Sequence, residues 1–242
     1  MHLNPQHMEI EQIYSRLLST SQRALSICAA NPGEGVTSVA LALAQRNLLA
    51  GKSTLLVDFN CYRPTLKPLL SLQNKTIGPL KDRLCPAVTE PQLLSCAQGE
   101  LALTGIPCPQ RRELIMTFRK PGMLERCIDL WLQNYDTVLF DTSAINRSNA
   151  NNIPPERVAA ACDGAVLVVL AGRTTEAMAD SAITRLRDEG AQLLACIYND
   201  RDNPCLKNEL LRELKRLEPR FKGIVRYLGA WLHNNRLLAM SI

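Results

Sequence analysis

The chain has 242 residues and a formal net charge of +5, with 46% hydrophobic and 21% charged residues. This composition is ordinary for a globular protein, so we expect neither a disordered chain nor a membrane span, which needs about 18 consecutive apolar residues. We expect no secretory signal, because the amino terminus lacks a basic segment followed by an apolar core. The nine cysteines are scattered without a Cys-x-x-Cys pair, which favours reduced thiols over disulfides or a zinc site.

In chain order, we expect a helical arm over residues 1–20, followed by one domain over residues 21–242. Short apolar runs predict strands at 24–29, 54–58, 101–103, 138–141, 165–170, 193–198 and 223–227. Residues 66–98 are rich in proline and leucine and are interpreted as short helices and turns. Strands that alternate with helical segments predict a single α/β domain with a doubly wound, mostly parallel sheet.

A glycine-rich turn follows the first predicted strand and leads into a helical segment. Its residues are Gly33, Glu34, Gly35, Val36, Thr37 and Ser38. In a Walker A loop, Gly-x-x-x-x-Gly-Lys-[Ser/Thr], backbone N–H groups cradle phosphate, the lysine reaches the β- and γ-phosphates, and the hydroxyl holds Mg²⁺. Thr37 stands at the hydroxyl position, but Val36 replaces the lysine. The alternative is an ordinary tight turn.

Two aspartates end later strands, and this is where an α/β sheet places its Mg²⁺ ligands. Asp58 closes the second strand, and Asp141 closes the strand at 138–141. Either carboxylate could instead cap a strand end. The stretch 51–54, Gly-Lys-Ser-Thr, imitates the end of a Walker motif, but it leads into a strand rather than a helix.

Taken together, these motifs resemble those of the MinD/ParA-type deviant-Walker P-loop ATPases (the SIMIBI class). The resemblance is strongest to the bacterial tyrosine-kinase branch associated with capsule and exopolysaccharide export. Five ordered stretches carry it: 29–37 (Ala-Ala-Asn-Pro-Gly-Glu-Gly-Val-Thr), 58–64 (Asp-Phe-Asn-Cys-Tyr-Arg-Pro), 135–142 (Tyr-Asp-Thr-Val-Leu-Phe-Asp-Thr), 162–169 and 195–199.

The resemblance implies that the domain binds ATP or ADP with Mg. It assigns nucleotide contacts to the loop residues 33–38, Arg63 and Asn199, and metal contacts to Thr37, Asp58 and Asp141. In an active enzyme, Asp58 and Asp141 would also serve catalysis.

The departures from the family pattern concern charge. Besides Val36, Asn31 occupies the position of the MinD signature lysine, and Asn60 replaces the second aspartate of the strand-2 motif. A lost charge-assisted hydrogen bond costs roughly 1.5–3 kcal/mol, so losing the lysine weakens phosphate binding about ten- to a hundredfold. Phosphoryl transfer should suffer more, because cations stabilise its transition state.

We therefore expect a pseudo-ATPase: a regulator or scaffold of bacterial exopolysaccharide or cellulose secretion that acts through partner binding. The BcsQ-like cellulose-secretion proteins, which also lack the lysine, are a related resemblance. The alternative is an active ATPase in which Lys52, Arg63, Arg173 or a partner supplies the missing cation. A tyrosine kinase is less favoured, because the tail lacks a tyrosine cluster and the first helix keeps only Glu11 of Glu-x-x-Arg-x-x-Arg.

The carboxyl-terminal part carries much of the positive charge. Residues 201–242 contain nine Lys or Arg and four Asp or Glu, a balance of +5, and leucines at 206, 210, 214 and 217 predict a basic amphipathic helix. It could dock on the sheet or meet an anionic partner or a membrane surface. The expected partners are proteins of a membrane-associated polysaccharide export complex, in a homodimer or heteromer, and not nucleic acid. The expected location is the cytoplasm, with peripheral contact at the inner membrane as an option.

Overall fold

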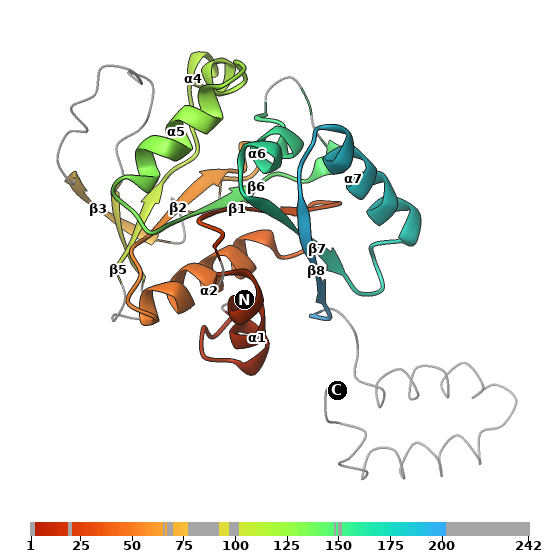
Figure 1. Cartoon of the computed structure of the whole chain (residues 1–242), viewed down its shortest axis with the longest axis horizontal. Coiled ribbons are helices and arrows are strands. Elements are labelled where there is room, and N and C mark those ends of the chain that lie inside the picture. The colour runs from red at the N-terminus through yellow and green to blue at the C-terminus, as the bar shows by residue number, and fades with distance from the viewer. Residues whose placement is uncertain are drawn as a thin grey trace, which may run out of the picture. The chain divides into compact units, whose positions relative to one another are not determined.

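A computed structural model describes residues 3–18, 21–64, 66, 70–76, 92–96, 102–147, 149 and 152–201. The described strands form one sheet in the order β3-β4-β5-β2-β6-β1-β7-β8 (Figure 1). Their bounds are β1 Ala24–Ala29, β2 Thr54–Phe59, β3 Leu70–Thr76, β4 Gln92–Cys96, β5 Ala102–Ile106, β6 Thr137–Thr142, β7 Gly164–Leu170 and β8 Leu193–Asn199.

Helices cover both faces of this sheet (Figure 1). Their bounds are α1 Met8–Leu17, α2 Val36–Leu49, α4 Arg112–Phe118, α5 Met123–Leu132, α6 Pro155–Ala161 and α7 Glu176–Asp188, with a short 3₁₀ turn, η1, at Ile145–Arg147. One apolar cluster joins α1 and α2 to the sheet, and two others join the opposite face to α4, α5, α6 and α7. Two covered faces explain why β1, β2 and β6 are buried at every residue.

The predicted α/β class with a mostly parallel sheet is confirmed. Neighbouring strands from β5 through β2, β6, β1 and β7 to β8 run parallel. The predicted strands at 24–29, 54–58, 138–141, 165–170 and 193–198 all form, each within one residue of its expected bounds. The strand predicted at 101–103 starts one residue later and continues to Ile106.

The interpretation of residues 66–98 as short helices and turns is wrong for two segments. β3 and β4 are strands, and β4 pairs antiparallel with both β3 and β5. Antiparallel strands need no continuous apolar run, so the mixed composition of Leu70–Thr76 hid this one. The strand predicted at 223–227 and the basic amphipathic helix lie outside the described residues. The division into 1–20 and 21–242 stays a prediction, although α1 does form within the expected arm.

Polar side chains connect the strands at the end of the sheet where the parallel strands begin. We call this end the amino edge of the sheet. Buried Asn47, near the end of α2, donates from Nδ2 to Thr54 Oγ1 and Thr137 Oγ1, each at 2.9 Å. These bonds join α2 to the first residues of β2 and β6.

Two more contacts strengthen the amino edge. Asp136 accepts hydrogen bonds from Ser53 N at 2.8 Å and Ser53 Oγ at 2.7 Å. Arg23 donates to the carbonyl oxygens of Leu132 and Tyr135 at the end of α5, and to that of Asp136. The amino edge is therefore a structural polar network.

The amino-terminal helix is attached to its own domain. Arg46 on α2 forms a bidentate ion pair with Glu11 on α1, and its guanidinium lies 4.2 Å from the centre of the Tyr14 ring. The hydrogen bond from Arg46 lowers the pKa of Glu11. Within the described ranges, no helix is both long and apolar enough to cross a membrane.

Candidate functional site

The predicted site lies at the carboxyl edge of the sheet, because parallel strands end on the same side. Five neighbouring strands, β2, β6, β1, β7 and β8, lead to it. They bring together groups that lie far apart in the sequence: Asp58, Asp141, the loop 31–38, Thr174 and Asn199. An α/β sheet places its ligand crevice at this edge.

Glycine is required at Gly35 of the phosphate loop. Gly33 and Gly35 have φ values of 84° and 106°, which favour glycine. A Cβ atom at Gly35 would lie 2.5 Å from Nδ2 of Asn199, whereas one at Gly33 would meet nothing within 4 Å. Gly35 therefore allows close contact with β8, whereas the space beside the Gly33 Cα is unfilled. The loop leads directly into α2, whose first residue is Val36.

Glu34 holds this loop from within. Its side chain is buried, with 2% of the residue exposed. Its carboxylate accepts hydrogen bonds from Asn31 N at 3.0 Å and Asn31 Nδ2 at 3.1 Å, and a short one from Thr174 Oγ1. Its carbonyl oxygen accepts from Asn199 Nδ2 at 2.8 Å. Glu34 thus connects the loop to the ends of β7 and β8.

Sequence reasoning assigned Glu34 a nucleotide contact and did not predict this bridging role. It also missed Thr174, which lies 140 residues away along the chain. The only local signal was a hydroxyl shortly after the end of a buried strand. Asn31, at the position of the signature lysine, is a hydrogen-bond partner of Glu34 rather than a cation.

Val36 belongs to the apolar core. The residue is 9% exposed and is part of the cluster that joins α1 and α2 to the sheet. The lysine position is therefore filled by a packed aliphatic side chain. Ser38, in the first turn of α2, is half-buried.

The groups predicted to bind metal do lie together. Thr37 Oγ1 donates to Asp141 Oδ2 at 2.6 Å, and Asp58 is the partner of Asp141 in the parallel register of β2 and β6. Asp58 also accepts from Asn60 N at 2.9 Å and Leu66 N at 3.2 Å, so it stabilises the turn after β2. Both aspartates are fully buried.

A hydroxyl beside a carboxylate at the start of a helix offers the hard oxygen ligands that Mg²⁺ prefers alongside phosphate. Within the described residues, no group of three or more His, Cys, Asp or Glu could hold a metal ion. The residues therefore fit a magnesium nucleotide that supplies phosphate oxygens itself. Thr37 and Asp141 would hold the metal, and the backbone of the glycine-rich loop would hold the phosphates.

The candidate substitute cations lie in different places. Lys52 precedes β2 and donates from Nζ to the carbonyl oxygen of Leu18 at 3.2 Å. It is six residues before Asp58, so at roughly 3.3 Å per residue it lies about 20 Å from the site, at the opposite edge. The expectation that Lys52 could replace the Walker lysine is therefore wrong. Arg63 and Arg173 are exposed, in the turns after β2 and β7.

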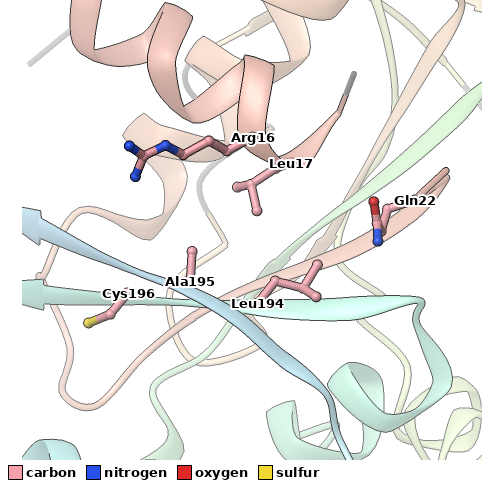
Figure 2. A pocket seen from close by; sticks show the side chains of 6 residues that line it. All are labelled: Arg16, Leu17, Gln22, Leu194, Ala195 and Cys196. Atoms are coloured by element: carbon pink, nitrogen blue, oxygen red, sulfur yellow. The ribbon is translucent and has the colours of Figure 1, made fainter. Parts of the chain in front are cut away.

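A hollow of about 390 Å³ lies away from the loop. It is lined by Arg16 and Leu17 of α1, by Gln22, and by Leu194, Ala195 and Cys196 of β8 (Figure 2). None of the residues predicted to bind nucleotide lines it.

Comparisons with known proteins bear on this geometry. No family model matches the chain. Tyrosine-protein kinase YwqD of Bacillus subtilis is 29% identical over 180 residues, which cover 73% of this chain and 72% of that protein.

Two solved structures illustrate the likeness in fold. The kinase domain of Escherichia coli tyrosine kinase ETK has a TM-score of 0.57 at 20% identity, covering 78% of this chain and 71% of that one. MinD from Pyrococcus horikoshii, solved with Mg-ADP, has a TM-score of 0.55 at 19% identity, covering 75% and 72%. The chain thus has the P-loop fold shared by MinD and the bacterial tyrosine-kinase domains, which confirms the resemblance that its motifs carry.

Proposed function

We propose that the chain is a nucleotide-binding regulator that binds ATP or ADP with magnesium and hydrolyses ATP slowly or not at all. It acts by binding protein partners in a bacterial exopolysaccharide or cellulose secretion system, at the cytoplasmic side of the inner membrane. The observation that carries the proposal is the packed Val36 side chain at the lysine position of an otherwise retained phosphate loop.

Retained groups support nucleotide binding. The glycine-rich loop with Gly33, the Thr37–Asp141 pair and Asn199 all lie at the carboxyl edge. MinD, which shares this fold, was solved with Mg-ADP. Bound magnesium would neutralise phosphate charge there, and Thr37 and Asp141 would orient it.

The charge balance of the loop supports impaired catalysis. Val36 brings no charge, and the buried carboxylate of Glu34 lies within the same loop. The missing lysine should weaken phosphate binding about ten- to a hundredfold and transition-state binding by more. A protein of this kind acts through its partners, and we place the dimer or partner surface around the loop.

The deciding experiment measures Mg-ADP and Mg-ATP affinity by calorimetry, and phosphate release, for wild type and Val36→Lys. Wild type should bind weakly and release no more phosphate than Thr37→Ala, the matched variant that lacks the metal hydroxyl. Val36→Lys should bind about ten- to a hundredfold more tightly. Rapid hydrolysis by wild type would overturn the proposal, as would no binding by either protein.

The alternative, an active ATPase with a substitute cation, is tested in the same assay. Arg63→Ala and Arg173→Ala should leave phosphate release unchanged if the protein is a pseudo-ATPase. Hydrolysis by wild type that either variant abolishes would establish the alternative. Lys52→Ala serves as the control, because Lys52 lies at the amino edge.

The cellular role has its own test. Neighbouring genes for a glycosyltransferase or a polysaccharide chain-length regulator would support the placement in secretion. A chromosome-segregation neighbourhood would instead point to a positioning protein of the ParA kind.

A further inference from the structure

Two cysteines approach each other beside the predicted site. Cys61 follows β2, three residues after Asp58, and Cys108 follows β5. β2 and β5 pair in parallel, with Val57 opposite Ile106. Continuing that register by two residues places Cys108 beside Phe59.

The turn after β2 brings Cys61 back to the same position. Its amide donates to the carbonyl oxygen of Phe59 at 3.0 Å, so the chain folds back after the strand. The Cys61 side chain packs on the apolar cluster that contains Phe59 and Ile106. Both residues are free thiols; Cys61 is half-buried and Cys108 is buried.

The two thiols are close enough to affect each other's ionisation. A hydrogen bond from Cys108 stabilises the ionised form of Cys61, which lowers the pKa of the Cys61 thiol. The same bond and burial raise the pKa of Cys108. While Cys61 is protonated, the Cys108 thiol donates its hydrogen bond to the carbonyl oxygen of Pro109, at 3.8 Å. Cys61 is therefore the more exposed and more readily ionised member of the pair, as an attacking thiol should be.

We propose that Cys61 and Cys108 form a redox-modification site, which closes reversibly to a disulfide when a low-molecular-weight disulfide such as oxidised glutathione reacts with Cys61. This inference is independent of the proposed nucleotide function.

The chemistry balances in two exchange steps. The Cys61 thiolate attacks one sulfur of the oxidant, which forms a mixed disulfide and releases one thiol. Cys108 then loses its proton to solvent and attacks Cys61 Sγ, which releases the second thiol. The two protein thiols lose two electrons, and one oxidant disulfide becomes two thiols. Excess reduced thiol reverses the reaction.

The disulfide would lie beside the turn that follows β2, which Asp58 stabilises. Asp58 accepts hydrogen bonds from Asn60 N and Leu66 N, and Arg63 N donates to the carbonyl oxygen of Asn60 in the same turn. A covalent bond from Cys61 to Cys108 would fasten this turn to the segment between β5 and α4. Oxidation would thus restrain the turn after β2, which is part of the candidate site.

Mass spectrometry of the oxidised full chain tests this. The folded protein is treated with oxidised glutathione, blocked with iodoacetamide and digested with trypsin and Glu-C without reduction. Cys61 is then the only cysteine of peptide 53–75, and Cys108 the only one of peptide 101–111. We expect these two peptides to appear linked in most molecules and to separate after dithiothreitol.

Three variants complete the test. Cys108→Ala should accumulate the glutathione adduct on Cys61, because the second step is lost. Cys61→Ser should leave Cys108 unmodified. Cys196→Ser, which removes an exposed thiol distant from the pair, should leave the linked peptides unchanged. The proposal is overturned if wild type accumulates the Cys61 adduct without the link, or if neither Cys61 nor Cys108 reacts, whether or not Cys196 does.

Discussion

Asn199 donates a hydrogen bond from Nδ2 to the carbonyl oxygen of Glu34 over 2.8 Å, across 165 positions of sequence. The contact joins the last residue of β8 to the phosphate loop and explains why residue 35 is a glycine. The asparagine that the family resemblance assigns to the nucleotide therefore also fixes the shape of the loop.

Replacing Gly35 with alanine should lower stability more than the same change at Gly33. Both positions pay the strain of positive φ, but only at Gly35 does the new Cβ meet Asn199 Nδ2, at 2.5 Å. The Asn199 amide group can move aside, but it then loses its hydrogen bond to the carbonyl oxygen of Glu34, so we expect an additional loss of about 0.5–1.5 kcal/mol. Urea unfolding of the two variants measures the difference, and equal losses would show that the contact is not tight.

Removing the charge of Glu34 should destabilise the domain although the side chain keeps its size. In Glu34→Gln, an amide replaces a carboxylate that accepts three hydrogen bonds from Asn31 and Thr174. We expect a loss of about 1–3 kcal/mol in the free energy of unfolding. Asp129→Asn, on the exposed face of α5, is the matched control and should change little. A loop that tolerates glutamine equally well would argue against the bridging role.

If the chain binds magnesium nucleotide, Thr37→Ala should abolish the increase in ADP affinity that Mg²⁺ provides. Wild type should then bind ADP more tightly when Mg²⁺ is present, because the paired Thr37 and Asp141 would hold the ion. The alanine variant should lose roughly tenfold in Mg-ADP affinity and nothing in metal-free ADP affinity. Thr37→Ser keeps the hydroxyl and should behave as wild type. Calorimetry with and without EDTA checks all three proteins.

Asp136 should make stability depend on pH in the acid range. Hydrogen bonds from Ser53 lower the pKa of Asp136 in the folded state. The carboxylate therefore stabilises the fold fully above its unfolded pKa of about 3.9, and this contribution is lost as the pH falls through the lower folded value. The stability difference between wild type and Asp136→Asn should be constant from about pH 5 to 7 and should shrink below about pH 4. A difference independent of pH would contradict the assignment.

The parallel strands could be predicted from the sequence, because strands buried on both faces have nearly continuous apolar sequences. Strands such as Ala24–Ala29, in which every residue is buried, appear as short and mostly apolar runs in the sequence. β3 and β4 have no such apolar run, since each pairs antiparallel and its sequence mixes polar with apolar residues. From the sequence alone, these segments were therefore interpreted as short helices and turns.

The site was predictable where its members share a motif, and unpredictable where they meet only in space. Thr37 and Asp141 were identified from separate motifs, and the structure brings them to 2.6 Å. The partnership of Glu34 with Thr174 has no local signature, because it arises from the order of β1 and β7 in the sheet. Lys52 is the opposite case. The sequence around it resembles the end of a Walker motif, but it lies at the amino edge, away from the candidate site.

The polar network of the amino edge has an evolutionary consequence. Asn47, Arg23 and Asp136 join strand starts and helix ends without using any group of the phosphate loop. Substitutions in the phosphate loop therefore leave these contacts intact. Evolution can change the charge of that loop without breaking the network at the opposite end of the sheet.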